Sequence, residues 1–152
     1  VLLDAFQDDR LAHVQLVLLG DGPLMERAPQ MGPNVRFLGH RSPEEVREWM
    51  TRAWCLVHPT RADTSPNAVK EARVIGLPVI TTLHGGQTQY VRHGLSGCIV
   101  DNADTEAWVD ALRDMTQSRS QTLAKGRQGR KACRETLSSE VIKSKLYELY
   151  CL

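Results

Sequence analysis

The sequence lacks the features that mark membrane-spanning, secreted and nucleic-acid-binding chains. Its longest apolar runs are only a few residues, whereas a transmembrane helix needs about 20. No signal-peptide pattern is recognisable at its start. Positive and negative charges nearly balance, with a formal net charge of +1 at pH 7. Bulk electrostatics therefore predicts neither a nucleic-acid partner nor attraction of the whole chain to a membrane.

The cysteines lack the spacing of a metal site. Cys55, Cys98, Cys133 and Cys151 are scattered, with no CxxC pair and no cluster with histidines, so we predict no metal and no cofactor. Cys55 and Cys98 lie in apolar runs and are expected to be buried, unreactive thiols. Free thiols fit a reducing compartment, and we expect a cytoplasmic protein.

The length and composition suit one globular domain. The chain has 152 residues, of which 41% are hydrophobic and 24% are charged. No Met precedes Val1, and Leu2, Leu3 and Phe6 have the spacing of a helix already under way. We therefore expect residues 1–152 to be one domain of a longer protein.

Short apolar runs of strand length alternate with segments of helical character. The expected strands cover 14–20, 34–39, 54–59, 77–82 and 97–101, and the clearest helices cover 42–53, 65–76 and, in two or three pieces, the chain from 105 onward. This alternation predicts an α/β fold with a doubly wound parallel sheet. Right-handed crossovers place the carboxyl ends of such strands at one edge, where ligands bind.

Glycines and polar residues follow the expected strands. Gly20 and Gly22 suggest the dinucleotide-binding pattern G-x-G-x-x-G, but Met25 takes the third glycine position, so we expect no nicotinamide cofactor. Asp21 between them is expected to stabilise its own turn, with a weak role near a bound nucleotide as the alternative.

Two further groups lie at the same edge. His58 ends a strand and is expected to be structural, with a ligand contact as the alternative. Gly85 and Gly86 either let a ligand approach the backbone closely or simply form a tight turn.

The segment Arg61–Thr81 places carboxylates on both sides of a helix start. Ser65 is expected to cap the helix, with Pro66 at its first position. The free N–H groups of a helix start favour an anion such as phosphate. Asp63 in the loop and Glu71 on the helix would then flank it and accept hydrogen bonds from hydroxyl pairs. The simpler interpretation is that both acids only stabilise the helix dipole or face solvent.

Five segments carry a family resemblance: "LVLLGDGPL", "VRFLGH", "LVHPTRADTSPNAVKEARVIGLPVITT", "GGQTQYVRHGLSGCIVD" and "DTEAWVDALRDM". In this order they resemble the C-terminal domain of retaining glycosyltransferases of the group 1 type, which have the GT-B architecture. The resemblance covers about Val1–Glu135. It implies a Rossmann-like domain that binds a UDP-, GDP- or ADP-sugar for transfer with retention, generally without a protein-bound metal.

The resemblance also implies roles for particular residues. Glu71 matches the acid that binds the ribose hydroxyls, and Asp63 matches the acid that contacts hydroxyls of the donor sugar. The diphosphate and sugar would lie against the backbone of Thr64, Ser65, Pro66, Asn67 and Ala68. The base would pack near Leu38, Gly39, His40 and Arg41. Gly20, Gly22, Gly85 and Gly86 are additional candidates.

The sequence departs from the family pattern in three ways. Asp63 stands where a Glu is usual, and Thr64-Ser65 replaces the common Gly-Phe. The basic pair that holds the diphosphate, the first strand of this domain and the N-terminal acceptor-binding domain are all absent from residues 1–152, so we expect the chain to be inactive alone. An inactive sugar-nucleotide-binding module, half of a GT-B-like epimerase, and a structural or interaction domain remain alternatives.

A basic run covers Lys125–Arg134. Such a run is commonly a solvated helix face, and a phospholipid or nucleic-acid patch is the alternative. Aromatic residues that would stack on bases are missing from it, which disfavours nucleic acid. A peripheral association of the full-length protein with a membrane stays open.

Overall fold

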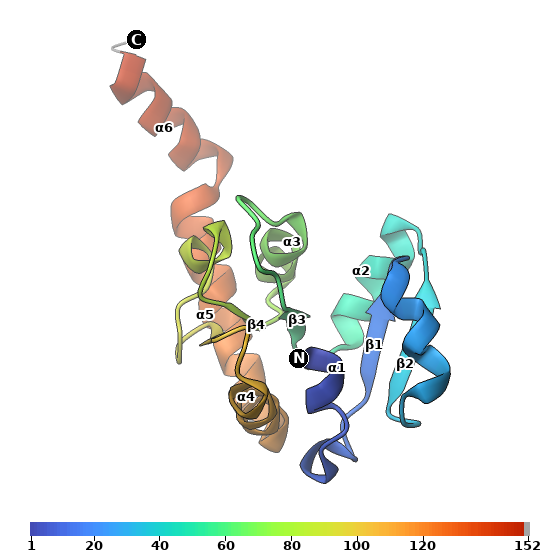
Figure 1. Cartoon of the computed structure of the whole chain (residues 1–152). Helices are drawn as coiled ribbons and strands as arrows, with labels where there is room; N and C mark the ends of the chain where they lie inside the picture. The colour runs from blue at the N-terminus through green and yellow to red at the C-terminus, as the bar shows by residue number, and fades with distance from the viewer. Residues whose placement is uncertain (151–152) are drawn as a thin grey trace.

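The computed structural model describes residues 1–150, apart from the side chains of residues 28 and 29. Its strands are all parallel to their neighbours and form two sheets (Figure 1). In the first sheet β1 (Leu16–Leu19) pairs with β2 (Val35–Gly39). In the second, β4 (Val79–Thr82) lies between β3 (Leu56–His58) and β5 (Gly97–Val100).

Helices connect the strands as expected for an α/β fold. The α-helices are α1 (Leu2–Ala5), α2 (Pro43–Arg52), α3 (Asn67–Ile75), α4 (Thr105–Gln117), α5 (Arg119–Leu137) and α6 (Ser139–Tyr150). Short 3₁₀ helices cover η1 (Asp9–Leu11), η2 (Pro23–Gln30) and η3 (Gly86–Gln89). The expected elements are confirmed, including three helical pieces after residue 105. Cys151, expected among the free thiols, lies outside the described residues.

The expected single sheet is in two parts. No ladder joins β1 to β3 in the part of the chain that the structure describes, so each of these strands is paired along one edge. The two sheets nevertheless share one apolar core. Leu16 and Val35 of the first sheet and Ile80 and Val100 of the second belong to the same buried cluster.

Both faces of the second sheet are covered. Ile80 packs with Trp108, Leu112 and other residues of α4, whereas its neighbour Val79 packs in a separate cluster with Val69 of α3. Successive residues of a strand point to opposite faces, so this division places helices on both sides of β4. The layered arrangement of a doubly wound fold follows.

Two glycines bring α5 into direct contact with the end of α3. Gly76 ends α3 with a φ of 83°, which suits a residue without a side chain. A methyl group added at Gly126 of α5 would lie 1.9 Å from the Gly76 carbonyl oxygen. The close crossing therefore requires glycine at position 126.

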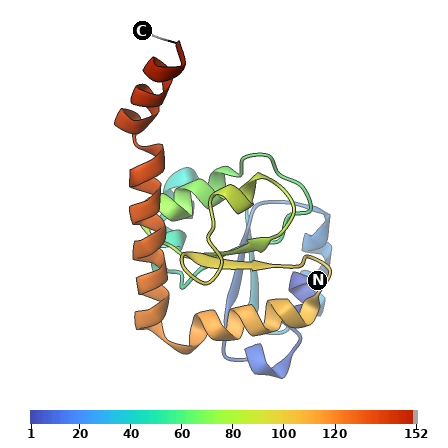
Figure 2. The ribbon, with the colours of Figure 1, turned by 90° about the vertical axis from the view of Figure 1, so that its left-hand side faces the viewer.

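The last helix leaves the body of the domain. Figure 2 shows α5 running along the side of the molecule and α6 continuing beyond it. No residue of α6 is buried. The compact domain is thus formed by the chain up to α5.

Candidate functional site

The loop between β3 and α3, which carries most of the predicted site, is fixed to β4 at its start. The hydroxyl of Thr81 donates to the carbonyl oxygen of His58 at 3.2 Å, and that of Thr82 donates to the carbonyl oxygen of Thr60 at 2.6 Å. Both threonines are fully buried. The loop therefore leaves the sheet edge in a defined direction.

Asp63 uses its carboxylate to shape this loop. Its Oδ1 accepts a hydrogen bond from the backbone N–H of Ser65 at 2.9 Å. Its Oδ2 lies 4.0 Å from Nε2 of His58, and the side chain is 35% exposed. A ligand can thus reach Asp63, but one oxygen already holds the loop's own backbone.

The predicted N-cap role of Ser65 is wrong. Helix α3 begins at Asn67 with Pro66 as its N-cap residue, and no side chain caps it. The Ser65 hydroxyl instead lies 3.0 Å from the hydroxyl of Tyr90 and accepts from Nζ of Lys70 at 3.2 Å. Because the Ser65 hydroxyl is engaged with these partners, it does not accept from the helix start. The first N–H groups of α3 therefore have no side-chain cap.

Gly85 and Gly86 pack against the same loop. The N–H of Gly86 donates to the carbonyl oxygen of Asp63 at 2.6 Å, and a methyl group at this position would lie 1.7 Å from the carbonyl oxygen of Thr64. At Gly85, with a φ of 116°, a methyl group would lie 2.6 Å from the Asp63 carbonyl oxygen. Both glycines are therefore required for the close packing of this turn against the loop at Asp63 and Thr64, with or without a ligand.

Sequence reasoning missed the side chains that support this arrangement. Lys70 and Tyr90 hold Ser65, while the fully buried Gln87 donates from Nε2 to the hydroxyl of Thr82 at 3.0 Å and to the carbonyl oxygen of His84. Gln87 and Tyr90 lie in the connection that follows β4, whereas the loop that they support follows β3. No local pattern in the sequence reveals such pairings.

The loops after β1 and β2 form a second group of candidates. The N–H of Gly20 donates to the carbonyl oxygen of Gly39 at 2.8 Å. Oδ1 of Asp21 accepts from the backbone N–H of His40 at 3.1 Å. Asp21 therefore links its loop to the neighbouring one, whereas we expected it to stabilise its own turn.

The remaining candidates lie near these two groups. Arg41 donates from Nη1 to the carbonyl oxygen of His40 at 3.0 Å, and its Nε lies 3.8 Å from Oε1 of Glu45. Glu71 is exposed on α3 and makes no ion pair with any described residue. Its carboxylate is therefore available to a ligand.

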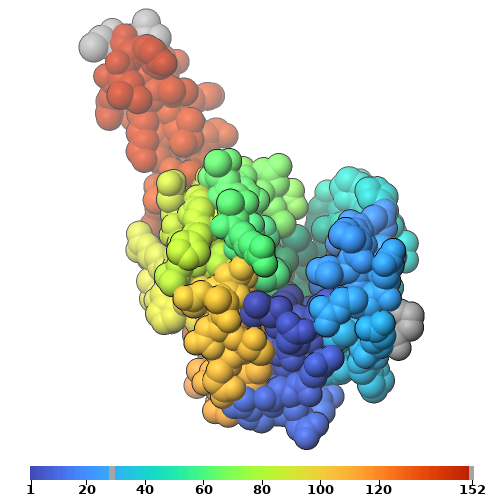
Figure 3. Space-filling view, in the orientation of Figure 1, coloured from blue at the N-terminus to red at the C-terminus, as the bar shows by residue number. Residues whose placement is uncertain are grey.

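The two groups of loops lie on the same side of the molecule. In Figure 1 the connections that follow β2 and β3 both lie at the upper end, one in each half. Figure 3 shows the surface hollowed between the two halves. No hydrogen bond joins the groups within the described residues, so a ligand that touched both would bridge two separately stabilised loop pairs.

Burial shifts the pKa values of His58 and of two cysteines. It lowers the pKa of His58 from its ordinary value of 6.5, and the nearby charge of Asp63 opposes this effect only in part. The ring is therefore neutral at pH 7. Cys55 and Cys98 are half-buried, whereas we expected both to be buried. Removal from water still raises the pKa of the Cys55 thiol to about 12 and raises that of Cys98, which agrees with the expectation of unreactive thiols.

Neither a metal cluster nor a membrane span is found where the structure is described. No three or more His, Cys, Asp or Glu side chains among these residues are grouped so that they could hold an ion. None of the described helices is both long enough and apolar enough to cross a bilayer.

Comparison with known proteins identifies sequence relatives. The chain matches the family described as Glycosyl transferases group 1 over residues 1–118. It is 35% identical over 94 residues to a D-inositol 3-phosphate glycosyltransferase from Nocardioides sp.. It is 29% identical over 103 residues to a GDP-mannose-dependent alpha-mannosyltransferase from Corynebacterium glutamicum. These stretches cover 62% and 68% of this chain but only 20% and 25% of the two relatives.

Solved structures show the same fold. HepE from Anabaena, determined in complex with UDP, superposes with a TM-score of 0.83 at 21% identity. The superposition covers 99% of this chain and 44% of that chain, so residues 1–152 span less than half of the protein they resemble. The fold agreement places the chain at the C-terminal, Rossmann-like half of the GT-B architecture.

Proposed function

Because the chain belongs to the group 1 glycosyltransferase family, we propose that it binds the nucleotide-sugar donor of a retaining glycosyl transfer. One observation carries this proposal. The start of α3 has no side-chain cap and lies between Asp63 and Glu71 along the chain. Uncapped N–H groups and the positive end of the helix dipole suit a diphosphate, and flanking carboxylates suit the hydroxyls of a ribose and a sugar.

The loop before α3 would hold the diphosphate through its backbone. The backbone of residues 64–68 forms this loop and the first turn of the helix. Lys70, which lies 3.2 Å from the Ser65 hydroxyl, adds a positive charge beside it. This cation would neutralise part of the charge of a phosphate bound here.

The two acids would bind the polyols. In this proposal the exposed carboxylate of Glu71 accepts hydrogen bonds from the ribose hydroxyls. Asp63 binds the donor sugar through Oδ2, since Oδ1 already accepts from Ser65. Leu38, Gly39, His40 and Arg41 would support the base, and Gly20 and Gly22 lie in the adjacent loop.

Transfer itself would need parts of the protein outside residues 1–152. A Rossmann sheet has the strand order 3-2-1-4-5-6, and the observed order β2-β1 and β3-β4-β5 leaves one position open between β1 and β3. We propose that a preceding strand fills it, and that a preceding domain binds the acceptor in cis. A cytoplasmic location remains a prediction.

Calorimetry with UDP and GDP tests the donor site on the chain as it stands. We expect binding in the high-micromolar range or weaker, because the cationic pair of the family lies outside the chain. Glu71→Ala should weaken binding by about tenfold or more, since a hydrogen bond to a charged group contributes about 1.5–3 kcal/mol.

Glu140→Ala is the matched control, because Glu140 is an exposed acid on α6, far along the chain from the proposed site. It should bind UDP like the wild type. Equal affinity of the wild type and Glu71→Ala would remove Glu71 from the ribose role. Absence of any UDP or GDP binding up to about 10 mM would count against the donor site as a whole.

A further inference from the structure

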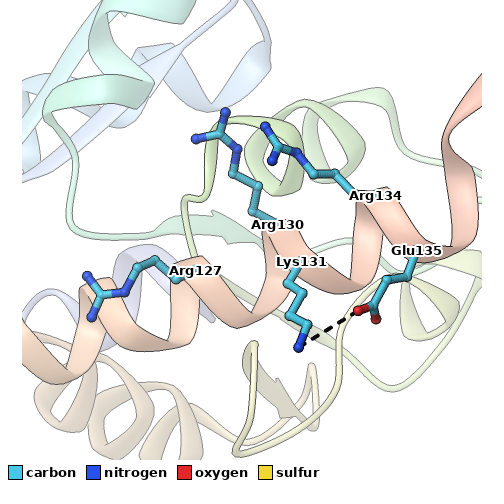
Figure 4. Close-up of a pocket in the computed structure, with 5 residues that line it drawn as sticks. All are labelled: Arg127, Arg130, Lys131, Arg134 and Glu135. Carbon is cyan, nitrogen blue, oxygen red and sulfur yellow. Dashed lines mark ion pairs between the residues drawn. The ribbon is translucent and has the colours of Figure 1, made fainter.

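One face of α5 gathers positive charge. These cations are Arg127 and Lys131, which are four residues apart, and Arg130 and Arg134, which are also four apart and begin three residues later, so all of them lie on the same face. They surround a shallow hollow of about 420 Å³ together with Glu135 (Figure 4). We call these four cations the basic face.

The chain itself neutralises little of this charge. Lys131 lies 3.9 Å from Oε1 of Glu135, and no other ion pair of the basic face is found in the described part of the chain. Side chains of like charge at such spacings repel one another. The side chain of Arg130 packs over Gly76, since a methyl group added at Gly76 would lie 3.6 Å from Cδ of Arg130. This packing gives a structural reason for Arg130 but not for the other three cations.

Apolar side chains adjoin the basic face. A second hollow of about 200 Å³ is lined by Arg130 and Arg134 together with Val74, Cys133, Leu137 and Ser138. Val74 is 57% exposed and Leu137 is 40% exposed. Charged and apolar groups thus lie next to each other on a surface made by α3 and α5.

We propose that the basic face binds the surface of a bilayer containing anionic phospholipids. Lipid phosphates would lie against the guanidinium and ammonium groups, and the glycerol and upper acyl carbons against Val74 and Leu137. Clusters of exposed Lys and Arg on a helix with adjacent apolar residues have the character of interfacial membrane contacts. No aromatic residue lines either hollow, so stacking on nucleic-acid bases has no support here.

Vesicle co-sedimentation tests this surface on the chain as it stands. We expect binding to phosphatidylcholine vesicles that contain about 30% phosphatidylglycerol, and none to phosphatidylcholine alone. The triple variant R127Q/K131Q/R134Q should bind about 100-fold more weakly, since each cation near an anionic surface contributes about 1 kcal/mol. Arg130 is left in place because its stem packs on α3.

The control variant R36Q/R47Q/R52Q removes the same number of charges from exposed positions on β2 and α2, and it should bind like the wild type. Leu137→Ser should weaken binding at unchanged charge. Equal weakening by both triple variants would reduce the effect to net charge and overturn the proposal. The proposal would also be overturned if about 10 mM glycerol 3-phosphate abolished vesicle binding. The same holds if the chain bound a single-stranded oligonucleotide through these three cations and did not bind vesicles.

The membrane proposal does not depend on the donor site. Circular dichroism and the calorimetric affinity for UDP should be the same in both triple variants. Loss of vesicle binding with UDP binding intact would separate the two surfaces.

Discussion

His58 illustrates how a single side chain can couple the candidate site to pH. Its Nδ1 is buried with no hydrogen-bond partner in the described structure, and its Nε2 lies 4.0 Å from Asp63. A buried donor or acceptor without a partner is costly, so a folded protein keeps one only for a specific reason, such as a role in function. The sequence marks His58 as the end of a strand but does not show this environment.

Acid should destabilise the chain through His58. The lowered pKa means that the unfolded chain binds a proton at His58 near pH 6.5, while the folded chain binds it only at lower pH. Stability contributed by the neutral ring is therefore lost with falling pH. We expect the free energy of unfolding, measured with urea, to decrease between about pH 7.5 and pH 5.5. His58→Gln should show a shallower decrease, and an unchanged slope would contradict this assignment.

At the scale of elements, the strands and helices could be predicted from the sequence because their signals are local. Each observed strand lies within the range that its apolar run predicted. The helix predicted over 42–53 has Ser42 as its N-cap, where both capping-box bonds with Glu45 form. The error at Ser65 has a tertiary cause, because Tyr90 competes for its hydroxyl. The break between β1 and β3 also depends on pairing across the chain, which local patterns do not contain.

The contact between the loop of Asp63 and the turn at Gly86 should be sensitive to one methyl group. Gly86→Ala would place a carbon 1.7 Å from the Thr64 carbonyl oxygen, so the loop must move. We expect a loss of about 1–3 kcal/mol in stability, typical of overpacking, and weaker UDP binding by calorimetry.

Gly22→Ala is the control for stability, because an added methyl group there has no heavy atom within 4 Å. Its free energy of unfolding should stay within about 0.5 kcal/mol of the wild type, as for most surface changes. Equal stability of Gly86→Ala and Gly22→Ala would contradict the close packing of Gly86 against the Thr64 carbonyl oxygen.

At the scale of the whole molecule, the last helix contributes little to the folded body. Helix α6 has no buried residue, yet it exposes Ile142, Leu146, Leu149 and Tyr150 at spacings typical of one apolar stripe. Nothing within the described residues covers this stripe. The apolar stripe of α6 therefore suits packing against a surface that residues 1–150 do not provide.

Removal of residues 139–152 should leave the domain intact. Because no side chain of α6 is buried, the thermal midpoint by circular dichroism should change by less than about 2 °C, which corresponds to about 1 kcal/mol or less for a domain of this size. UDP binding should also persist. A fall of about 10 °C would show that α6 packs on the body in solution.

The two-part sheet has a consequence for how the isolated chain behaves at high concentration. β1 and β3 each present one edge without a paired strand in the described structure. Backbone N–H and C=O groups along such an edge are a template for a strand of another molecule. The isolated chain therefore carries two edges for intermolecular strand addition beyond the outer edges of β2 and β5. A longer form that supplies the intervening strand would satisfy these two edges and leave fewer edges open to aggregation.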